Sequence, residues 1–150
     1  MDFKTLPTDY IETLDLDMGY YQPFVDDLLA RELTAESLEQ WMLDWTALAD
    51  VIGEQYARLS VMNTQDTNDK EIEEKYTKFL EKVMPETSAL AQKLKEKLLA
   101  AGLTPPNFDV QMRMIREEAA IYREENLPLL TEERKLDMEY DKVAGSQVVE

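Results

Sequence analysis

The sequence predicts an all-α protein, an antiparallel array of about five helices, and three observations lead to this fold class. Apolar residues recur every three or four positions over several long stretches, which places them on one face of a helix. The chain has only 4 Gly and 6 Pro in 150 residues, so long helices can form. Before the last five residues, no segment has the pattern of a convincing strand.

The chain divides into three parts. Residues 1–19 carry an acidic run without a sustained apolar period, which predicts an extended N-terminal arm that lies on the helices. Residues 20–145 form the helical domain. Residues 146–150 come after a helix stop, and the β-branched Val148 and Val149 predict the beginning of a strand. Because a strand needs a partner, we expect this one to belong to a following region, and the chain to be a piece of a longer protein.

The first two helices are predicted at residues 20–32 and 34–62, and their brief connection makes them neighbours. Pro23 is tolerated in the first helix because it falls in the first turn. Thr34 is the expected N-cap of the second, since its hydroxyl can accept a backbone N–H that lacks a helical partner. The second helix carries the core-facing stripe: Leu38, Trp41, Met42, Trp45, Leu48, Ala49, Ile52, Tyr56 and Leu59. We interpret this stripe as packing surface rather than a ligand site.

A third helical stretch is predicted from its expected cap, Asn68, to Gly102. Its apolar face consists of Ile72, Tyr76, Phe79, Leu80, Val83, Leu90, Leu94 and Leu98. Pro85 interrupts the stretch, because proline lacks the N–H of a helical hydrogen bond and its ring clashes with the preceding turn. Pro85 either kinks one helix or separates two, and we prefer the kink. Gly102 is expected to end the helix in a left-handed conformation.

Two more helices come after the proline-containing loop at residues 103–107. The fourth is predicted at residues 109–125. Its main face consists of Met112, Ile115, Ala119 and Tyr122. Met114 and Ile121 widen this stripe enough to suggest contacts on two sides. The fifth ends at Gly145 and carries the apolar residues Leu129, Leu136, Tyr140 and Val143.

The charge of the chain excludes several classes of partner. Lys and Arg together number 16 against 32 Asp and Glu, so the net charge is −16, which opposes binding to nucleic acid or to an anionic membrane. The N-terminus has neither the basic start nor the apolar run of a targeting segment, and no stretch is long and apolar enough to span a bilayer. We expect a soluble, cytoplasmic protein with no nucleic-acid and no membrane partner.

The chain also lacks the side chains of most catalytic sites. It has 0 Cys and 0 His, so no catalytic triad, no thiolate zinc site and no H-E-x-x-H zinc site can form within it. Its carboxylate pairs are interpreted as solvated helix faces: Glu71 with Glu74, Glu117 with Glu118, Glu124 with Glu125, and Glu132 with Glu133. Two acidic stretches, 15–19 and 66–70, lack the ligand pattern of a calcium loop. We therefore predict no catalytic, cofactor-binding or metal-binding residue in this chain.

Two segments carry a resemblance to a known family. The first reads EQYARLSVMNTQDTNDKEIEEKY, and the second covers residues 113–150 and includes ENLPLLTEERKLDMEYDKVAGSQ. Both resemble the N-terminal part of oligoendopeptidase F-like zinc metallopeptidases, which are related to thimet oligopeptidase, and the likeness is closest in the second segment. The resemblance implies a cytoplasmic zinc enzyme that cleaves oligopeptides inside a helical, channelled body. It also implies that the zinc ligands and general base come from an H-E-x-x-H helix and a later glutamate in a C-terminal half, which these residues do not include.

Two functions are consistent with the sequence. In the first, the chain is the non-catalytic N-terminal helical region of a zinc-dependent oligoendopeptidase, and it forms one wall of the peptide channel. Its partners would be the C-terminal catalytic region of the same polypeptide and the oligopeptide substrate. In the second, the chain is a stand-alone acidic adaptor or scaffold that binds a partner through its apolar faces. A wall fragment should expose apolar surface in isolation, whereas an adaptor should be a cooperative monomer or a symmetric dimer.

Overall fold

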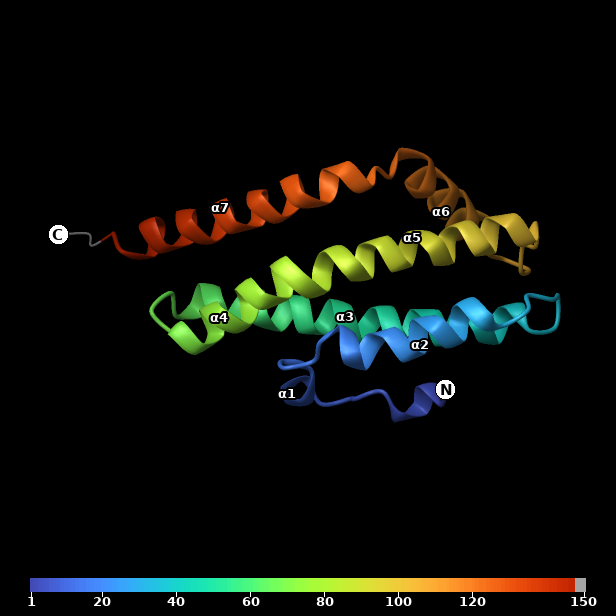
Figure 1. Cartoon of the computed structure of the whole chain (residues 1–150), viewed down its shortest axis with the longest axis horizontal. Coiled ribbons are helices and arrows are strands. Elements are labelled where there is room, and N and C mark those ends of the chain that lie inside the picture. Colours follow the sequence, from blue (N-terminus) through green and yellow to red (C-terminus); the bar gives the residue numbers. More distant parts are fainter. Residues whose placement is uncertain (148–150) are drawn as a thin grey trace.

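The computed structural model describes residues 1–147, and over these residues the structure is all-α, with no strand. The elements in chain order are η1 Phe3–Thr5, α1 Tyr10–Thr13, α2 Met18–Ala30, α3 Leu38–Gln65, α4 Lys70–Lys78, η2 Phe79–Val83, α5 Met84–Ala101, α6 Asp109–Ile121, η3 Glu124–Asn126 and α7 Leu127–Gly145. The five predicted helices correspond to α2, α3, the path from α4 through η2 to α5, α6 and α7. The helices α2, α3, α5 and α7 run in alternating directions, which confirms the antiparallel array (Figure 1).

The N-terminal segment packs on the helices, but its first residues are not the extended arm that we predicted. It contains η1 and α1, because aspartates cap short turns: Asp2 accepts the Lys4 N–H at 3.0 Å and Asp9 accepts the Ile11 N–H at 2.9 Å. Phe3 is buried, and its ring centroid lies 5.1 Å from that of Phe24 on α2. Figure 1 shows the segment running along one side of α2 and α3.

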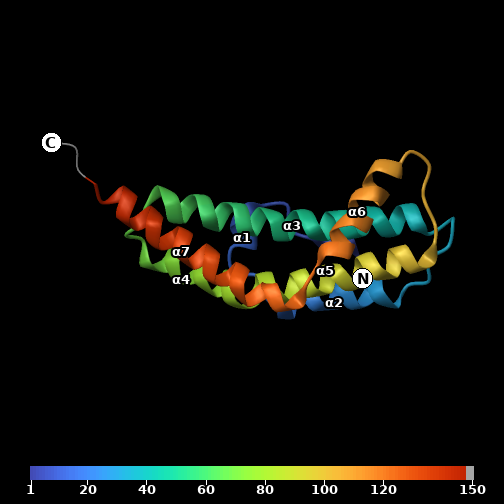
Figure 2. The same cartoon turned by 90° about the horizontal axis from the view of Figure 1, so that it is seen from above.

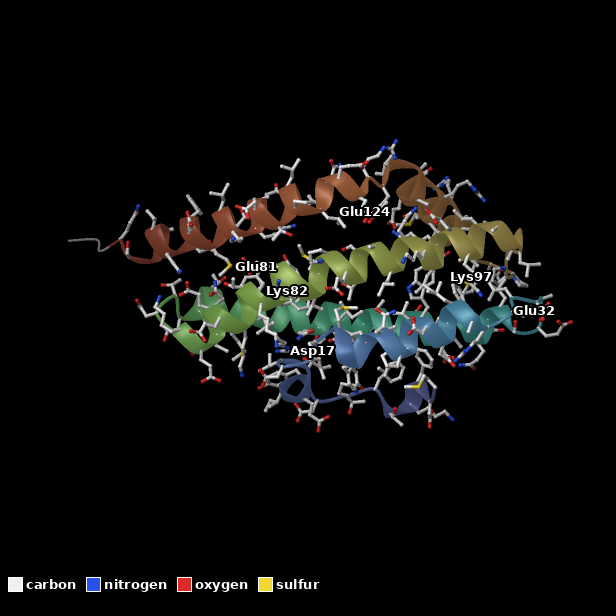
Figure 3. All side chains as sticks on the ribbon, in the orientation of Figure 1. Asp17, Glu32, Glu81, Lys82, Lys97 and Glu124 are labelled. Carbon is white, nitrogen blue, oxygen red and sulfur yellow. The ribbon has the colours of Figure 1, made fainter. Side chains whose placement is uncertain are left out.

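Helix α2 begins at Met18 rather than at residue 20, because Asp17 caps it by accepting the Gly19 N–H at 2.9 Å. Pro23 consequently lies inside the helix and beyond its first turn, so our prediction of its place was wrong. At the other end of α2, Lys97 of α5 donates a hydrogen bond to the Leu29 carbonyl at 2.7 Å. This lysine satisfies a carbonyl that the helix end leaves free (Figure 3).

Helix α3 begins four residues after the predicted start, and Thr34 nevertheless acts as a cap. The Ser37 N–H donates to the Thr34 hydroxyl at 3.2 Å, and the Thr34 N–H donates to the Ser37 hydroxyl at 2.9 Å. The Leu38 N–H also reaches the Thr34 carbonyl at 3.0 Å, so a turn leads directly into the helix. The reciprocal pair of bonds is the arrangement of a capping box, with serine in place of the usual Glu or Gln.

The buried face of α3 is rotated relative to the predicted stripe. Its buried residues are Leu38, Trp41, Met42, Leu48, Val51, Gln55, Leu59 and Asn63. Trp45 and Ile52 are only half-buried and Ala49 is exposed. Gln55 is held in the core by hydrogen bonds: it accepts from the Tyr21 hydroxyl at 2.7 Å and donates to the Leu16 and Leu14 carbonyls at 2.8 and 3.5 Å. The Trp41 indole N–H donates to the Leu28 carbonyl at 2.9 Å, which supplies the partner that a buried indole requires.

The path from α4 to α5 is continuous, as expected for a kink rather than two separate helices. Asp69, and not the expected Asn68, caps α4, because its carboxylate accepts two N–H groups, one of them from Glu71 at 3.0 Å. The π-helical η2 ends at Val83, two residues before Pro85. In this register the proline offers no N–H to the Leu80 carbonyl, which accepts instead from the Thr131 hydroxyl of α7 at 3.4 Å. Gly102 ends α5 with φ 64°, which confirms its predicted left-handed conformation.

Helices α6 and α7 form a second layer over α3 and α5, and they diverge from their junction (Figure 2). Helix α6 ends at Ile121 rather than at residue 125. Ser146 continues the last turn of α7, since its N–H donates to the Lys142 carbonyl at 3.1 Å, and the N–H of the following Gln147 reaches the Ala144 carbonyl at 3.3 Å. The predicted strand is therefore absent from residues 146 and 147, and its remaining part, residues 148–150, lies outside the described residues.

Candidate interaction surface

The outer layer is anchored by few residues. The buried residues of α6 and α7 are Met112, Thr131 and Met138. Ion pairs add to this attachment: the Lys135 ammonium lies 3.1 Å from a Glu81 carboxylate oxygen, and Lys142 pairs with Glu73. Figure 3 shows Glu81 between the inner helices and α7. Helix α7 therefore rests on the body of the domain through a narrow line of contacts.

Most apolar side chains of this layer face outward. The exposed large apolar residues of α6 and α7 are Val110, Met114, Ile121, Leu129, Leu130, Leu136, Tyr140 and Val143. On α7, the four apolar residues that the sequence analysis named for the fifth helix are between 62% and 71% exposed. Their spacing shows that the helix is amphipathic, but it does not show whether the body of this domain covers the apolar face.

The α7 outer stripe, by which we mean Leu129, Leu136, Tyr140 and Val143, is a continuous line along the helix. With about 100° of rotation per residue, these four positions fall within an arc of about 60°. Met138, which is 6% exposed, lies on the opposite side and contacts the core cluster. The stripe is thus a face of a fixed helix and is uncovered by any described residue of the chain.

On α6 the division is similar. Met112 is 3% exposed and faces the body, whereas Met114 and Ile121 are 51% and 76% exposed. The contacts on a second side that the sequence predicted are not made within the described residues. Both helices of the outer layer therefore present apolar side chains to solvent.

A groove opens between α3 and α5, beside this layer. It has a volume of about 270 Å³. Its lining residues are Val25, Trp45, Leu48, Ala49, Ile52, Gly53, Thr87, Ser88, Ala91 and Leu94. The hydroxyls that line it are already used, because Thr87 donates to the Val83 carbonyl at 2.8 Å and Ser88 to the Met84 carbonyl at 2.7 Å. The groove can accept an apolar group, and none of the residues that line it carries a charged side chain that could bind a polar one.

The pKa shifts in the domain have two causes, ion pairs at the surface and the burial of tyrosine side chains. Hydrogen bonds from Lys142 and from Lys70 lower the pKa of Glu73, and a hydrogen bond to Glu81 raises the pKa of Lys135. Burial raises the pKa of Tyr21, whose side chain is fully enclosed. These shifts belong to packing and helix attachment, because the groups concerned lie outside the groove.

The acidic residues take structural or solvated positions. All four carboxylate pairs that we interpreted as solvated faces are exposed. In the acidic stretches set aside as calcium loops, Asp17 and Asp69 are helix caps. Over residues 1–147, no group of three or more Asp or Glu side chains is placed to hold a metal ion.

The inner helices match a known family. The sequence model described as the Peptidase M3 N-terminal domain matches residues 12–104, which is more than half of the chain. The chain belongs to the Peptidase M3 N-terminal domain family. The match runs from α1 to the loop after α5, so the α6 and α7 layer of this M3 N-terminal domain lies beyond it. No curated protein and no solved structure gives a significant match to the chain.

The family assignment confirms the resemblance drawn from the sequence. It identifies the chain as an N-terminal region of an M3 peptidase. Among residues 1–147 of this M3 domain, no helix has both the length and the apolarity needed to cross a bilayer.

The sequence analysis did not find the groove or the exposed α7 stripe. The small residues Ala49 and Gly53 on one helix and Ala91 on another were the available signal for the groove, because small side chains leave space between helices. For the stripe, the signal was the distribution of charge around α7. Its cations fall on the side of the helix that faces the body, whereas acidic residues flank the apolar ones.

Proposed function

We propose that this M3 domain is the non-catalytic N-terminal helical region of a zinc-dependent oligoendopeptidase and forms part of the wall of its peptide channel. The observation that carries the proposal is the family match over residues 12–104. The chain composition supports it: with 0 His and 0 Cys, the domain needs another region to supply the usual zinc ligands. The intact enzyme would hydrolyse peptide bonds in short peptides in the cytoplasm.

The residues of this chain do not fit a catalytic zinc ion. Such an ion takes three protein ligands, commonly imidazoles with a carboxylate, and keeps one open position. Imidazole is missing from the sequence, and the described carboxylates do not converge. In the proposal, the ion is held by the C-terminal catalytic region, and these helices position and shelter the peptide.

The apolar face of α6 is a suitable contact for that catalytic region. Met114 and Ile121 would lose their exposure to water on such contact, and burying one side chain of this size contributes about 1.5–3 kcal/mol. The groove between α3 and α5 is the part of the wall that we expect to meet an apolar side chain of the substrate. The net charge of −16 would favour basic peptides.

The first test is the reading frame downstream of the Glu150 codon. The proposal expects an H-E-x-x-H motif and a later glutamate in the same frame. A stop codon directly after Glu150 in the genome would overturn it and leave the adaptor function in its place.

The wall itself is tested in the longer enzyme by filling the groove. Gly53→Leu adds a side chain where a Cβ meets no atom within 4 Å, so the domain should still fold. We expect a several-fold higher KM for peptides with bulky apolar side chains and a nearly unchanged kcat. Ala57→Leu, on the same helix but outside the groove, is the matched control. Equal kinetics for both variants would show that the groove does not meet substrate.

The second candidate function is an acidic helical adaptor, in which the exposed α7 outer stripe would bind a partner. The peptidase function requires a catalytic region after this domain in the same polypeptide and the adaptor function does not, so the same reading-frame test separates them. An adaptor would also behave as a cooperative monomer or symmetric dimer, whereas a wall fragment would bind a hydrophobic dye.

A further inference from the structure

The α7 outer stripe has the spacing of a helix-pairing seam. Leu129, Leu136 and Val143 repeat every seven residues, which keeps them on one line of contact with a neighbouring helix. All three are exposed, by 69%, 63% and 62%. The helix that carries them is held in place from behind by Met138. A partner helix would therefore meet a preformed surface.

Acidic residues lie beside this seam. Glu132 and Glu139 stand three residues after Leu129 and Leu136, on one margin of the stripe, whereas Tyr140 supplies the apolar residue four positions after Leu136. Both glutamates are exposed. Glu133 lies beside the stripe as well, and in the described structure neither it nor Glu139 forms an ion pair.

The cations of α7 are not available to balance these acids across a seam. Lys142 pairs with Glu73 of α4, and Lys135 pairs with Glu81 at 3.1 Å, so both point toward the body. Lys135 also reaches Glu132 at 3.4 Å from the side. Arg134 pairs with Asp137 at 3.3 Å. The outward face of α7 is thus apolar along its centre and acidic along its margins.

This charge pattern argues against a second copy of the chain as the occupant. In an antiparallel pairing about Leu136, Glu132 and Glu133 of one copy would lie opposite Glu139 of the other. Like charges so placed oppose association, and each copy carries a net charge of −16. An anionic membrane is disfavoured for the same reason.

We propose that the α7 outer stripe binds a basic amphipathic helix of a partner protein. Such a helix would carry apolar residues every seven positions and Lys or Arg at the positions that face Glu132 and Glu139. Its apolar residues would cover Leu129, Leu136 and Val143, and its cations would pair with the acidic margins. The proposal does not depend on the peptidase function.

The test uses the full chain, residues 1–150, and a labelled synthetic helix of about 24 residues with Leu at every seventh position and Lys at the margins. A matched helix with Glu at the margins is the control probe. Fluorescence anisotropy measures the affinity at low and at high salt. We expect the Lys helix to bind at least about tenfold more tightly than the Glu helix, with an affinity that falls as salt rises.

Variants of the chain locate the binding. Glu132→Lys with Glu139→Lys should weaken the Lys helix at least about tenfold, whereas Asp50→Lys with Glu74→Lys, which has the same net charge, should not. Leu136→Ser should weaken binding too, while Leu43→Ser, an exposed control on α3, should have no effect. Because all six positions are exposed, circular dichroism should show each variant folded.

Three results would overturn the proposal. Equal binding of the Lys and Glu helices would show that the acidic margins play no part. Unchanged binding by both stripe and margin variants would place the interaction elsewhere. A dimer of the chain that Leu136→Ser dissociates would show that the stripe pairs with a second copy.

Discussion

Gln55 is the residue that the apolar pattern could not reveal and that the core depends on. Its side chain is 1% exposed and connects three segments, because it bonds to Tyr21 of α2 and to the carbonyl of Leu16. A search for apolar spacing passes over such a residue, since a buried amide is stable only when specific partners surround it. Val51 and Asn63 lie on the same rotated face.

Gln55→Leu should destabilise the domain by about 1–3 kcal/mol, because the Tyr21 hydroxyl and the Leu16 carbonyl would both lose a buried partner. Gln40→Leu is the matched control on the same helix, since Gln40 is exposed. Urea unfolding followed by circular dichroism measures both variants. Equal unfolding midpoints would contradict the role assigned to Gln55.

Because Tyr21 is buried, we expect the domain to lose stability at alkaline pH. Burial raises its pKa above the ordinary value of 10.0 in the folded protein. Stability from this group is complete below the unfolded pKa, and it is lost as pH rises above about 10, because the unfolded chain releases the proton first. The contribution of Tyr21 to the unfolding free energy should therefore be constant below about pH 10 and fall above it.

The measurement is a series of urea unfolding curves from pH 8 to pH 11. Tyr21→Phe should show a shallower decline above pH 10, and some decline should remain because burial also raises the pKa of Tyr76. Tyr140→Phe, at a position that is 71% exposed, should keep the full decline. The same slope in all three proteins would refute the role of Tyr21.

At the scale of elements, Gly53 and Gly102 allow the effect of backbone conformation on stability to be measured without a change in packing. A Cβ at Gly53 or at Gly102 would meet no atom within 4 Å, yet only Gly102 has a positive φ, of 64°. Gly53→Ala should stabilise the domain by about 0.5–1 kcal/mol, because alanine loses less backbone entropy in a helix. Gly102→Ala should destabilise it by about 1 kcal/mol through left-handed strain. Thermal unfolding compares the two, and shifts of the same sign would contradict the explanation.

Helix α7 should open more readily than α3. It has two buried residues, Thr131 and Met138, whereas α3 has eight. Local opening requires less free energy where fewer buried contacts are broken. In hydrogen–deuterium exchange, amides of α7 should exchange well before those at the centre of α3. Simultaneous exchange of both helices would show that the two layers unfold as one unit.

Some features of the helices could be predicted from the sequence and others could not. Helix-forming periods, the continuous path through Pro85 and the stop at Gly102 were all predictable, because they depend on neighbours along the chain. Cap positions shifted by a residue, from Asn68 to Asp69, since several adjacent side chains can cap. The face of α7 could not be predicted, because what covers an apolar stripe depends on tertiary contacts that local patterns do not contain.

At the scale of the whole molecule, the domain is an acidic helical body with a lightly attached, outwardly apolar layer. The prediction that this chain supplies no catalytic residue follows directly from the sequence, since imidazole and thiol side chains are missing from all 150 residues. The groove could not, because its volume depends on how α2, α3 and α5 are spaced. In the function that we propose, this M3 domain shapes a site whose chemistry is supplied by another region.

Peptide hydrolysis by the purified chain is the sharpest test of this division of roles. The chain, residues 1–150, is incubated with a fluorogenic oligopeptide and added zinc, and bound metal is measured on the same preparation. We predict no cleavage above the level of a mock purification and no stoichiometric zinc. Cleavage that co-purifies with the chain and persists at constant specific activity would contradict the proposed division.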